Sequence, residues 1–305
     1  MPLASTKSLK FNEVVFKSYI IGVVITLQII FCIFCFKKSN ADIEWIKDLS
    51  YEENQIYDIS FNFFNPCPSV PVIIGDKKVK LLFDSGNGVG ITLTTALEKE
   101  IDYEIIGATT ELNSDGTYRG SGKSILLKNI YVFDEEYTDI ISSLVDWKIY
   151  SSFKIDGMIG LKYFDKVVTL DYKNKKIAVS NKALDYSKLK NDEYTVLPLI
   201  KSDLNNEQDL LFIEGEVNGV KSTIYLDTGS SSSFYNFDDA QAEIEVKLGK
   251  KTYTFNSNKL IHDKIGFQDE FKYPLSLAIN SDLLKANHFV ITIDKIHNNL
   301  IIGQN

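Results

Sequence analysis

The sequence has 305 residues, 44% hydrophobic and 24% charged, which is enough for one or two hydrophobic cores and excludes a disordered chain. Its formal net charge is −8. Once the five lysines and one glutamate of residues 1–41 are set aside, 28 basic residues face 40 acidic ones, so nucleic acid is a poor partner. Three cysteines and three scattered histidines offer neither a disulfide framework nor metal-ligand spacing, so we expect no metal and no cofactor.

The amino terminus differs from the rest of the chain. Residues 1–18 form a short basic tail, and Tyr19–Phe36 is an 18-residue run without a charged side chain, close to the length of a membrane-spanning helix. The run shows no polar face at helical spacing, which disfavours a buried core helix. We predict a single-pass membrane anchor, a stalk over 37–56 and an extracytoplasmic domain. The alternative is secretion after signal-peptide cleavage near Ala41.

The first segment with strand character ends in an unexpected polar motif. A Gly75-Asp76 turn leads into the apolar residues LLF, and these lead directly into Asp84-Ser85-Gly86. Asp and Gly are common turn formers, so a single copy of this motif would indicate only a turn.

The motif occurs twice. VNGVKSTIYLDTGSS, residues 217–231, aligns without a gap to IGDKKVKLLFDSGNG, residues 74–88, and places Asp227 on Asp84. In the second copy, Asn218-Gly219 supplies a strong hairpin signal. A chance origin is therefore a poor explanation for the repeated carboxylate.

A second pair of segments repeats farther along the chain. VVTLDYKNKKIAV, residues 167–179, aligns without a gap to VITIDKIHNNLII, residues 290–302. Each half is thus predicted to begin with a hairpin that leads into an acidic loop and to end with another hairpin. We expect two lobes, formed by residues 57–190 and 191–305.

Two lobes related by a pseudo-twofold axis would bring Asp84 and Asp227 together. Two adjacent carboxylates cannot both ionise at low cost, so they share one proton and their apparent pKa values separate. The ionised member can then take a proton from a water molecule while the protonated member polarises a carbonyl group. This is general acid–base hydrolysis of an amide, without a metal or a covalent intermediate.

The neighbours of the two aspartates suit such a site. The hydroxyl groups of Ser85 and Thr228 could form hydrogen bonds across the axis and fix the two loops. Gly86 and Gly229 would let the backbone turn tightly beside the substrate.

The paired Asp-Ser/Thr-Gly loops, each after an apolar strand, resemble those of the retropepsin-like and pepsin-like aspartic proteases. Met158-Ile159-Gly160 matches a further family mark, two apolar residues and a glycine behind the catalytic loop. The 143-residue separation of the aspartates suits compact, bacterial-type members. The resemblance covers about residues 57–305 and implies a mainly β, bilobal acid-protease fold with two pseudo-twofold-related, barrel-like lobes. Because one chain carries both aspartates, it also implies a monomer.

The resemblance has departures. In the second lobe Ala278-Ile279-Asn280 stands where the glycine mark should be, and we expect Asn280 to replace glycine because asparagine tolerates positive φ. Asn87 follows the first loop where the family commonly has Ala or Ser. A hairpin containing Ser114, Asp115 and Gly116 occupies the interval of the family's substrate-binding flap, with an exposed surface turn as the alternative.

Other chemistries fit less well. Residues 86–90 read GNGVG after a strand, but the glycine spacing is not that of a dinucleotide-binding loop. Residues 230–233 form a serine cluster without the G-x-S-x-G pattern. Asp171 and Asp294 also repeat, and because a hairpin turn follows each we predict a turn role for both.

The sequence therefore predicts an aspartic endopeptidase that acts on peptide or protein substrates and is tethered to the membrane. The dyad would be Asp84 and Asp227. The rival interpretation is a non-catalytic peptide-binding or scaffolding protein with the same fold.

Overall fold

The computed structural model describes residues 40, 43–62, 65–112, 117–147, 150, 153–162, 164, 166–190, 192–200, 210–238, 242–266 and 271–304. The chain divides into two units, Met1–Lys47 and Asp48–Asn305, and the second contains both sheets. The predicted anchor, Tyr19–Phe36, and Ala41 lie outside the described residues. Within the described ranges, no helix is both long and apolar enough to cross a membrane.

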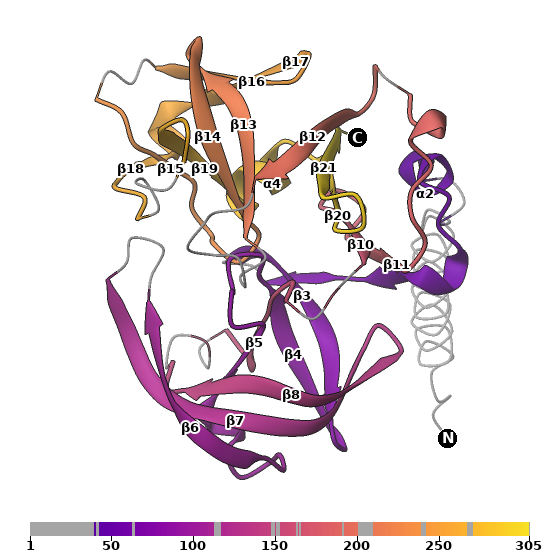
Figure 1. The fold of residues 1–305 in the computed structure, drawn as a ribbon, viewed down its shortest axis with the longest axis vertical. Coiled ribbons are helices and arrows are strands. Elements are labelled where there is room, and N and C mark those ends of the chain that lie inside the picture. The colour runs from indigo at the N-terminus through magenta and orange to yellow at the C-terminus, as the bar shows by residue number, and fades with distance from the viewer. Residues whose placement is uncertain are drawn as a thin grey trace, which may run out of the picture. The chain divides into compact units, whose positions relative to one another are not determined.

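The second unit is mainly β and contains two sheets (Figure 1). The eight-stranded sheet has the order β2-β3-β4-β9-β5-β8-β7-β6. Its strands are β2 (Ser60–Asn62), β3 (Asn65–Ile74), β4 (Lys77–Phe83), β5 (Ile91–Thr94), β6 (Glu104–Leu112), β7 (Tyr118–Val132), β8 (Glu135–Val145) and β9 (Gly157–Ile159). These strands form the first lobe, at the bottom of Figure 1.

The thirteen-stranded sheet has the order β1-β11-β10-β20-β21-β12-β13-β14-β19-β15-β18, and β16 joins β13 to β17. Its strands are β1 (Ile56–Asp58), β10 (Val167–Asp171), β11 (Lys176–Ser180), β12 (Thr195–Ile200), β13 (Leu211–Val217), β14 (Val220–Asp227), β15 (Phe234–Tyr235), β16 (Glu243–Leu248), β17 (Lys251–Asn256), β18 (Ile261–His262), β19 (Leu275–Asn280), β20 (Phe289–Asp294) and β21 (Asn299–Gln304). The helical segments are α2 (Glu44–Asp48), α4 (Ser281–Ala286) and the 3-10 turns η2 (Glu53–Gln55), η3 (Thr95–Leu97), η4 (Tyr186–Lys188) and η5 (Ser257–Lys259).

The predicted hairpin before each Asp-Ser/Thr-Gly motif is confirmed. β3 pairs with β4 through a Gly75-Asp76 turn, and β13 pairs with β14 through Asn218-Gly219. Asn218 and Gly219 have φ of 50° and 79°, as expected for the turn that joins twisted antiparallel strands. The last residues of β4, Leu81–Phe83, are fully buried, which fixes where the strand ends and the first acidic loop begins.

The same three-strand arrangement follows each hairpin. In the first lobe β4 lies parallel to β9, and β9 is antiparallel to β5. In the second lobe β14 lies parallel to β19, which is antiparallel to β15. β5 and β15 each begin seven residues after their aspartate, so the duplicated sequence forms duplicated topology.

The two halves meet in the part of the large sheet formed by β10 and β20. These strands are antiparallel with Thr169 opposite Thr292, and the two hydroxyl groups lie 2.7 Å apart. The gapless alignment of the closing hairpins puts these same two threonines on each other, so a local twofold axis passes between them. Tyr51, from the segment predicted as a stalk, is buried and places its hydroxyl 2.9 Å from that of Thr169.

The repeated aspartates of the thirteen-stranded sheet, Asp171 and Asp294, have the predicted turn role. Asp171 Oδ1 accepts a hydrogen bond from the backbone N–H of Asn174 at 2.9 Å, and Asp294 Oδ1 accepts one from that of His297 at 3.0 Å. Both acceptors lie three residues before their donors, so each carboxylate closes the turn that follows its strand.

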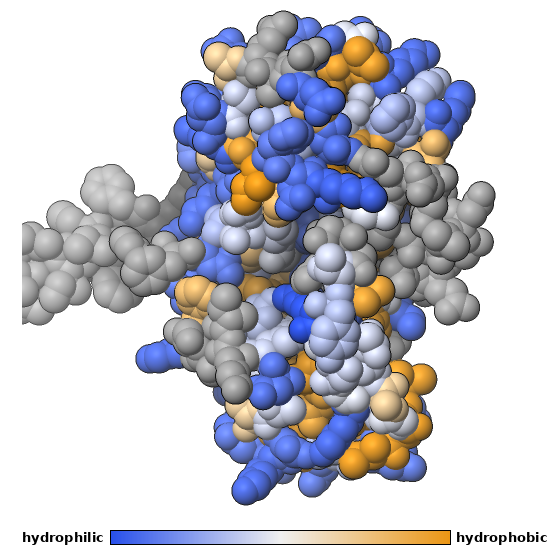
Figure 2. Space-filling view, turned by 90° about the vertical axis from the view of Figure 1, so that its left-hand side faces the viewer, coloured by the Kyte–Doolittle hydropathy of each residue, from blue (hydrophilic) through white to orange (hydrophobic). Residues whose placement is uncertain are grey.

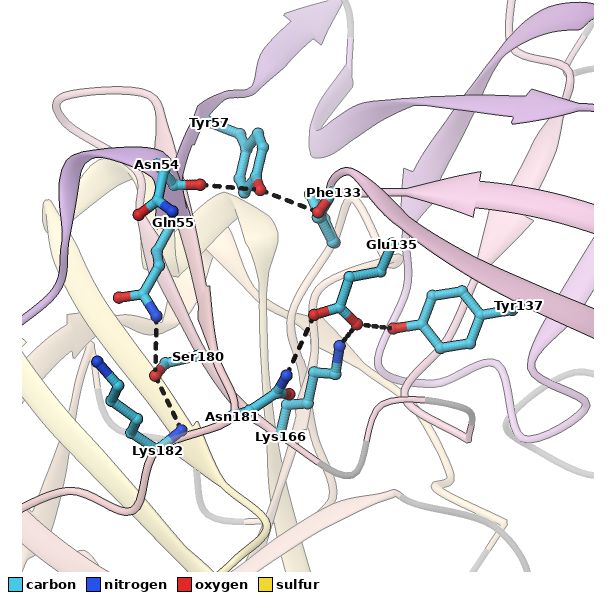
Figure 3. A network of polar contacts seen from close by, with 10 residues as sticks. All are labelled: Asn54, Gln55, Tyr57, Phe133, Glu135, Tyr137, Lys166, Ser180, Asn181 and Lys182. Carbon is cyan, nitrogen blue, oxygen red and sulfur yellow. Dashed lines mark hydrogen bonds and ion pairs between the residues drawn. The ribbon is translucent and has the colours of Figure 1, made fainter.

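A polar network connects the first lobe to the thirteen-stranded sheet (Figure 3). Glu135, at the start of β8, forms an ion pair with Lys166 and accepts hydrogen bonds from Tyr137 and Asn181. Lys166 is buried, and burial lowers the pKa of its amine. Because Lys166 immediately precedes β10, the network connects the β7–β8 turn to the sheet on which the two halves meet.

Apolar side chains are also exposed on the first lobe. They gather at the lower end of the space-filling view, over β6–β8 (Figure 2). The large hydrophobic residues exposed on these strands are Ile105, Ile106, Leu112, Tyr118, Tyr131 and Ile141.

Candidate active site

The two predicted aspartates end equivalent strands. Asp84 follows β4, and its backbone N–H donates to the carbonyl oxygen of Ile159 at 2.9 Å. Asp227 is the last residue of β14 and lies opposite Asn280 of the parallel strand β19. Both carboxyl groups are therefore held at the ends of buried strands.

Ser85 and Thr228 join the two loops by reciprocal hydrogen bonds. The backbone N–H of Ser85 donates to Thr228 Oγ1, and that of Thr228 donates to Ser85 Oγ, each at 3.0 Å. Each hydroxyl group also donates across the junction, Thr228 Oγ1 to the Phe83 carbonyl at 2.7 Å and Ser85 Oγ to the Leu226 carbonyl at 3.3 Å. Both residues are buried, so this set of bonds fixes the separation of the loops.

The glycines allow the carboxyl groups to approach. A Cβ atom on Gly86 would lie 2.8 Å from Asp227 Oδ2 and 2.6 Å from the hydroxyl oxygen of Tyr225. A Cβ atom on Gly229 would overlap the carboxyl group of Asp84. Their backbone N–H groups instead donate to the aspartates, Gly86 to Asp84 Oδ1 and Gly229 to Asp227 Oδ1, both at 2.8 Å. Only glycine fits at either position.

The two carboxyl groups have different electrostatic environments. Burial, the charge of Asp227 and the hydrogen bond between the two groups hold the pKa of Asp84 well above its ordinary range. Burial also raises the pKa of Asp227, but the N–H groups of Gly229 and Ser230 and the hydrogen bond from Asp84 act against this. Asp84 is only 6% exposed, whereas Asp227 is half-buried. These environments favour the protonated form at Asp84 more than at Asp227.

Two side chains that the sequence had not assigned to the site, Cys67 and Tyr225, lie beside the dyad, and the charge of a third, Arg119, acts on it. The thiol of Cys67 is buried and donates to the Gly229 carbonyl at 3.2 Å. The hydroxyl of Tyr225 lies against Gly86, and burial together with the charges of Asp227 and Asp84 raises its pKa. The charge of Arg119 lowers the pKa values of both aspartates.

Two of these three residues, Tyr225 and Arg119, stand out in the sequence and could have been proposed as site residues. Tyr225 lies two residues before Asp227, where the aligned residue of the first copy is Leu82. Arg119 is the only arginine in the chain. For Cys67 we find no such signal, because it reaches the dyad through the folding of β3.

Asn280 replaces glycine for a different reason from the one predicted. Its φ is −113°, so no positive φ is required and the explanation from left-handed backbone was wrong. In the first lobe a Cβ atom on Gly160 would collide with the carbonyl oxygen of Asn87. In the second lobe there is room for a side chain, and Asn280 Nδ2 donates to the Ser232 carbonyl at 2.6 Å.

Ser114, Asp115 and Gly116, the predicted flap tip, lie outside the described residues. The strands on either side of them do form an antiparallel pair, with Leu112 of β6 opposite Tyr118 of β7.

Comparisons with known proteins gave no match to a family model and no match to a curated protein sequence.

Proposed function

We propose that the chain is an aspartic endopeptidase with a bilobal acid-protease fold. The observation that carries this proposal is the reciprocal pairing of Ser85 and Thr228, which brings the loops of Asp84 and Asp227 together so that the glycine of each lies against the carboxyl group of the other. A buried carboxyl group is costly to keep beside a second one, and carboxyl groups with such raised pKa values concentrate at functional sites.

The proposed reaction uses the asymmetry of the dyad. Asp227, ionised, takes a proton from a water molecule, whose oxygen attacks the peptide carbonyl carbon. Asp84, protonated, donates its proton to the carbonyl oxygen, and a neutral tetrahedral diol forms. Collapse of the diol moves a proton from one hydroxyl group to the departing amide nitrogen, which leaves a carboxylic acid and an amine.

We also propose that residues 19–36 tether the enzyme to a membrane and that the unit from Asp48 onward is extracytoplasmic. Full-length protein should then remain in the membrane fraction after an alkaline carbonate wash. Recovery of a soluble form that begins near Asp42 would instead favour signal-peptide cleavage.

The activity test uses the full chain and a peptide library, with new peptide termini detected by mass spectrometry. The wild type should generate termini, whereas Asp84→Asn and Asp227→Asn should generate none. Asp139→Asn is the matched control, because Asp139 is an exposed carboxylate on β8 paired with Lys128. Binding of a statine-type inhibitor without any cleavage by the wild type would favour the scaffold alternative.

A further inference from the structure

Arg119 lies on β7, in the strand that follows the predicted flap tip, and its position is fixed. The centre of its guanidinium group is 4.1 Å from the centroid of the Trp147 ring. One of its nitrogens, Nη2, donates to the hydroxyl of Tyr150 at 2.7 Å. A guanidinium group on an indole face is attracted by the ring and keeps the N–H groups along its edge available.

The two aromatic side chains under Arg119 are linked to the loop of Asp227 through Cys67. Trp147 and Tyr150 are buried, with ring centroids 5.1 Å apart, and pack in one apolar cluster with Cys67. Cys67 in turn contacts the loop of Asp227 through the Gly229 carbonyl. The Tyr150 hydroxyl lies 3.4 Å from the sulfur of Met158, in the segment behind the first loop. The guanidinium group is therefore held on the first lobe, over a cluster that reaches the loops of both aspartates through Cys67 and Met158.

The guanidinium group of Arg119 has more N–H donors than its contact with Tyr150 uses. A guanidinium group has five N–H donors, and the Tyr150 hydroxyl is a neutral partner. Across the described part of the chain, Arg119 makes no ion pair with a carboxylate, although the sequence contains 41 acidic residues. The side chain is exposed. Its fixed edge is suited to bidentate recognition of a carboxylate that comes from outside the chain.

We propose that Arg119 selects acidic peptides, binding the side-chain carboxylate of an Asp or Glu next to the cleaved bond. The inference rests on the proposed protease function, because the dyad is what places the substrate backbone beside Arg119. It adds the substrate class, which the dyad alone leaves open.

The test separates binding from cleavage. Two eight-residue peptide libraries are made that are identical except that a central position holds Glu in one and Gln in the other. Their binding to the full-length Asp84→Asn variant is measured by calorimetry at low salt. We expect the Glu library to bind on the order of 10- to 100-fold more tightly, the effect of a charge-assisted hydrogen bond. Arg119→Met should abolish the difference, and Arg119→Lys should retain only part of it.

Lys123→Met is the matched control, because Lys123 is another cation of β7 but is paired with Glu98. It should leave the Glu-to-Gln ratio unchanged. Equal binding of the two libraries, binding of neither, or loss of the ratio in Lys123→Met would overturn the inference. Cleavage is then measured with the wild type. A Glu preference in binding without cleavage would refute the protease but not the carboxylate site. Cleavage without a Glu preference would refute the carboxylate site but not the protease.

Discussion

Leu82 and Tyr225 occupy the same place in the two lobes, two residues before the aspartate, yet only Tyr225 brings a polar group to the dyad. The same contrast holds elsewhere: Gly160 has no space for a side chain, whereas its counterpart Asn280 uses one to bind the Ser232 carbonyl. The strand topology and the crossed hydroxyl groups, in contrast, are nearly symmetric.

The difference shows how a duplicated chain can give two equivalent carboxyl groups different surroundings. The symmetric elements set where the carboxyl groups stand, since each loop needs a buried strand before it and a partner hydroxyl from the other lobe. The asymmetric elements set the electrostatic environment of each carboxyl group. Asp84 is the more deeply buried, whereas Asp227 is less buried and receives more hydrogen-bond donors, which favours its charged form. Each prediction below changes one side of this comparison.

The largest effect is expected from removing either carboxylate. Asp84→Asn or Asp227→Asn should lower kcat by at least about 10²- to 10⁴-fold, because one carboxyl group cannot act as both acid and base. Cleavage of a peptide substrate found in the library screen measures this directly. A single variant that kept most of its activity would show that the pair is not the catalytic group.

The next effect concerns the crossed hydroxyl groups. Thr228→Ala leaves the Ser85 N–H and the Phe83 carbonyl without their buried partner, which should reduce the free energy of unfolding by about 2–4 kcal/mol. Thr228→Ser gives the second loop the same Asp-Ser-Gly motif as the first and keeps the hydroxyl. It should cost only about 1 kcal/mol, the value of one buried methyl group.

Urea denaturation of the two variants measures these losses. Equal losses in both would mean that the methyl group, and not the hydrogen bonds across the junction, stabilises the loops.

A smaller effect is expected at Asn280, where the lobes differ most in sequence. Asn280→Gly restores the residue of the first lobe but removes one of the two side-chain hydrogen bonds to the Ser232 carbonyl and leaves that from Ser230 Oγ, so it should destabilise the protein by about 1 kcal/mol. The same denaturation experiment measures it. A gain in stability would show that the asparagine is a tolerated defect and that the two lobes require the same residue after all.

Much of the fold followed from local patterns in the sequence. The hairpins before Asp84 and Asp227 were visible as apolar strands on either side of Gly-Asp and Asn-Gly turns, and the gapless repeat predicted that Thr169 and Thr292 are equivalent. These features depend on residues near one another in the chain.

The parts that the sequence did not provide depend on contacts between distant residues. Cys67 reaches Gly229 across 162 positions of the chain, and no spacing pattern carries that information. The reason for Asn280 could not be predicted either. Whether a side chain fits at this position depends on the loop of Ser232, which is distant in the sequence. The order of burial of the two aspartates was also invisible, since their motifs differ by a single methyl group.

The smallest effect concerns stability and pH, and it distinguishes the two aspartates without an activity assay. Folding raises the pKa of Asp84 above its unfolded value of about 4, so the folded state disfavours the ionised form. Below pH 4 the group is protonated in both states and costs nothing. As the pH rises from there through the folded pKa, the unfolded chain releases its proton first, and the folded protein loses about 1.4 kcal/mol of stability for each pH unit that separates the two pKa values. Asp84→Asn carries no such charge. Its melting temperature should therefore equal that of the wild type in acid and exceed it by a few degrees at neutral pH. Asp227→Asn should show a smaller gain, because its N–H donors favour the charge that the variant removes. Thermal unfolding of the three proteins from pH 3 to 8 gives these differences, and a larger gain in Asp227→Asn would reverse the assignment of acid and base.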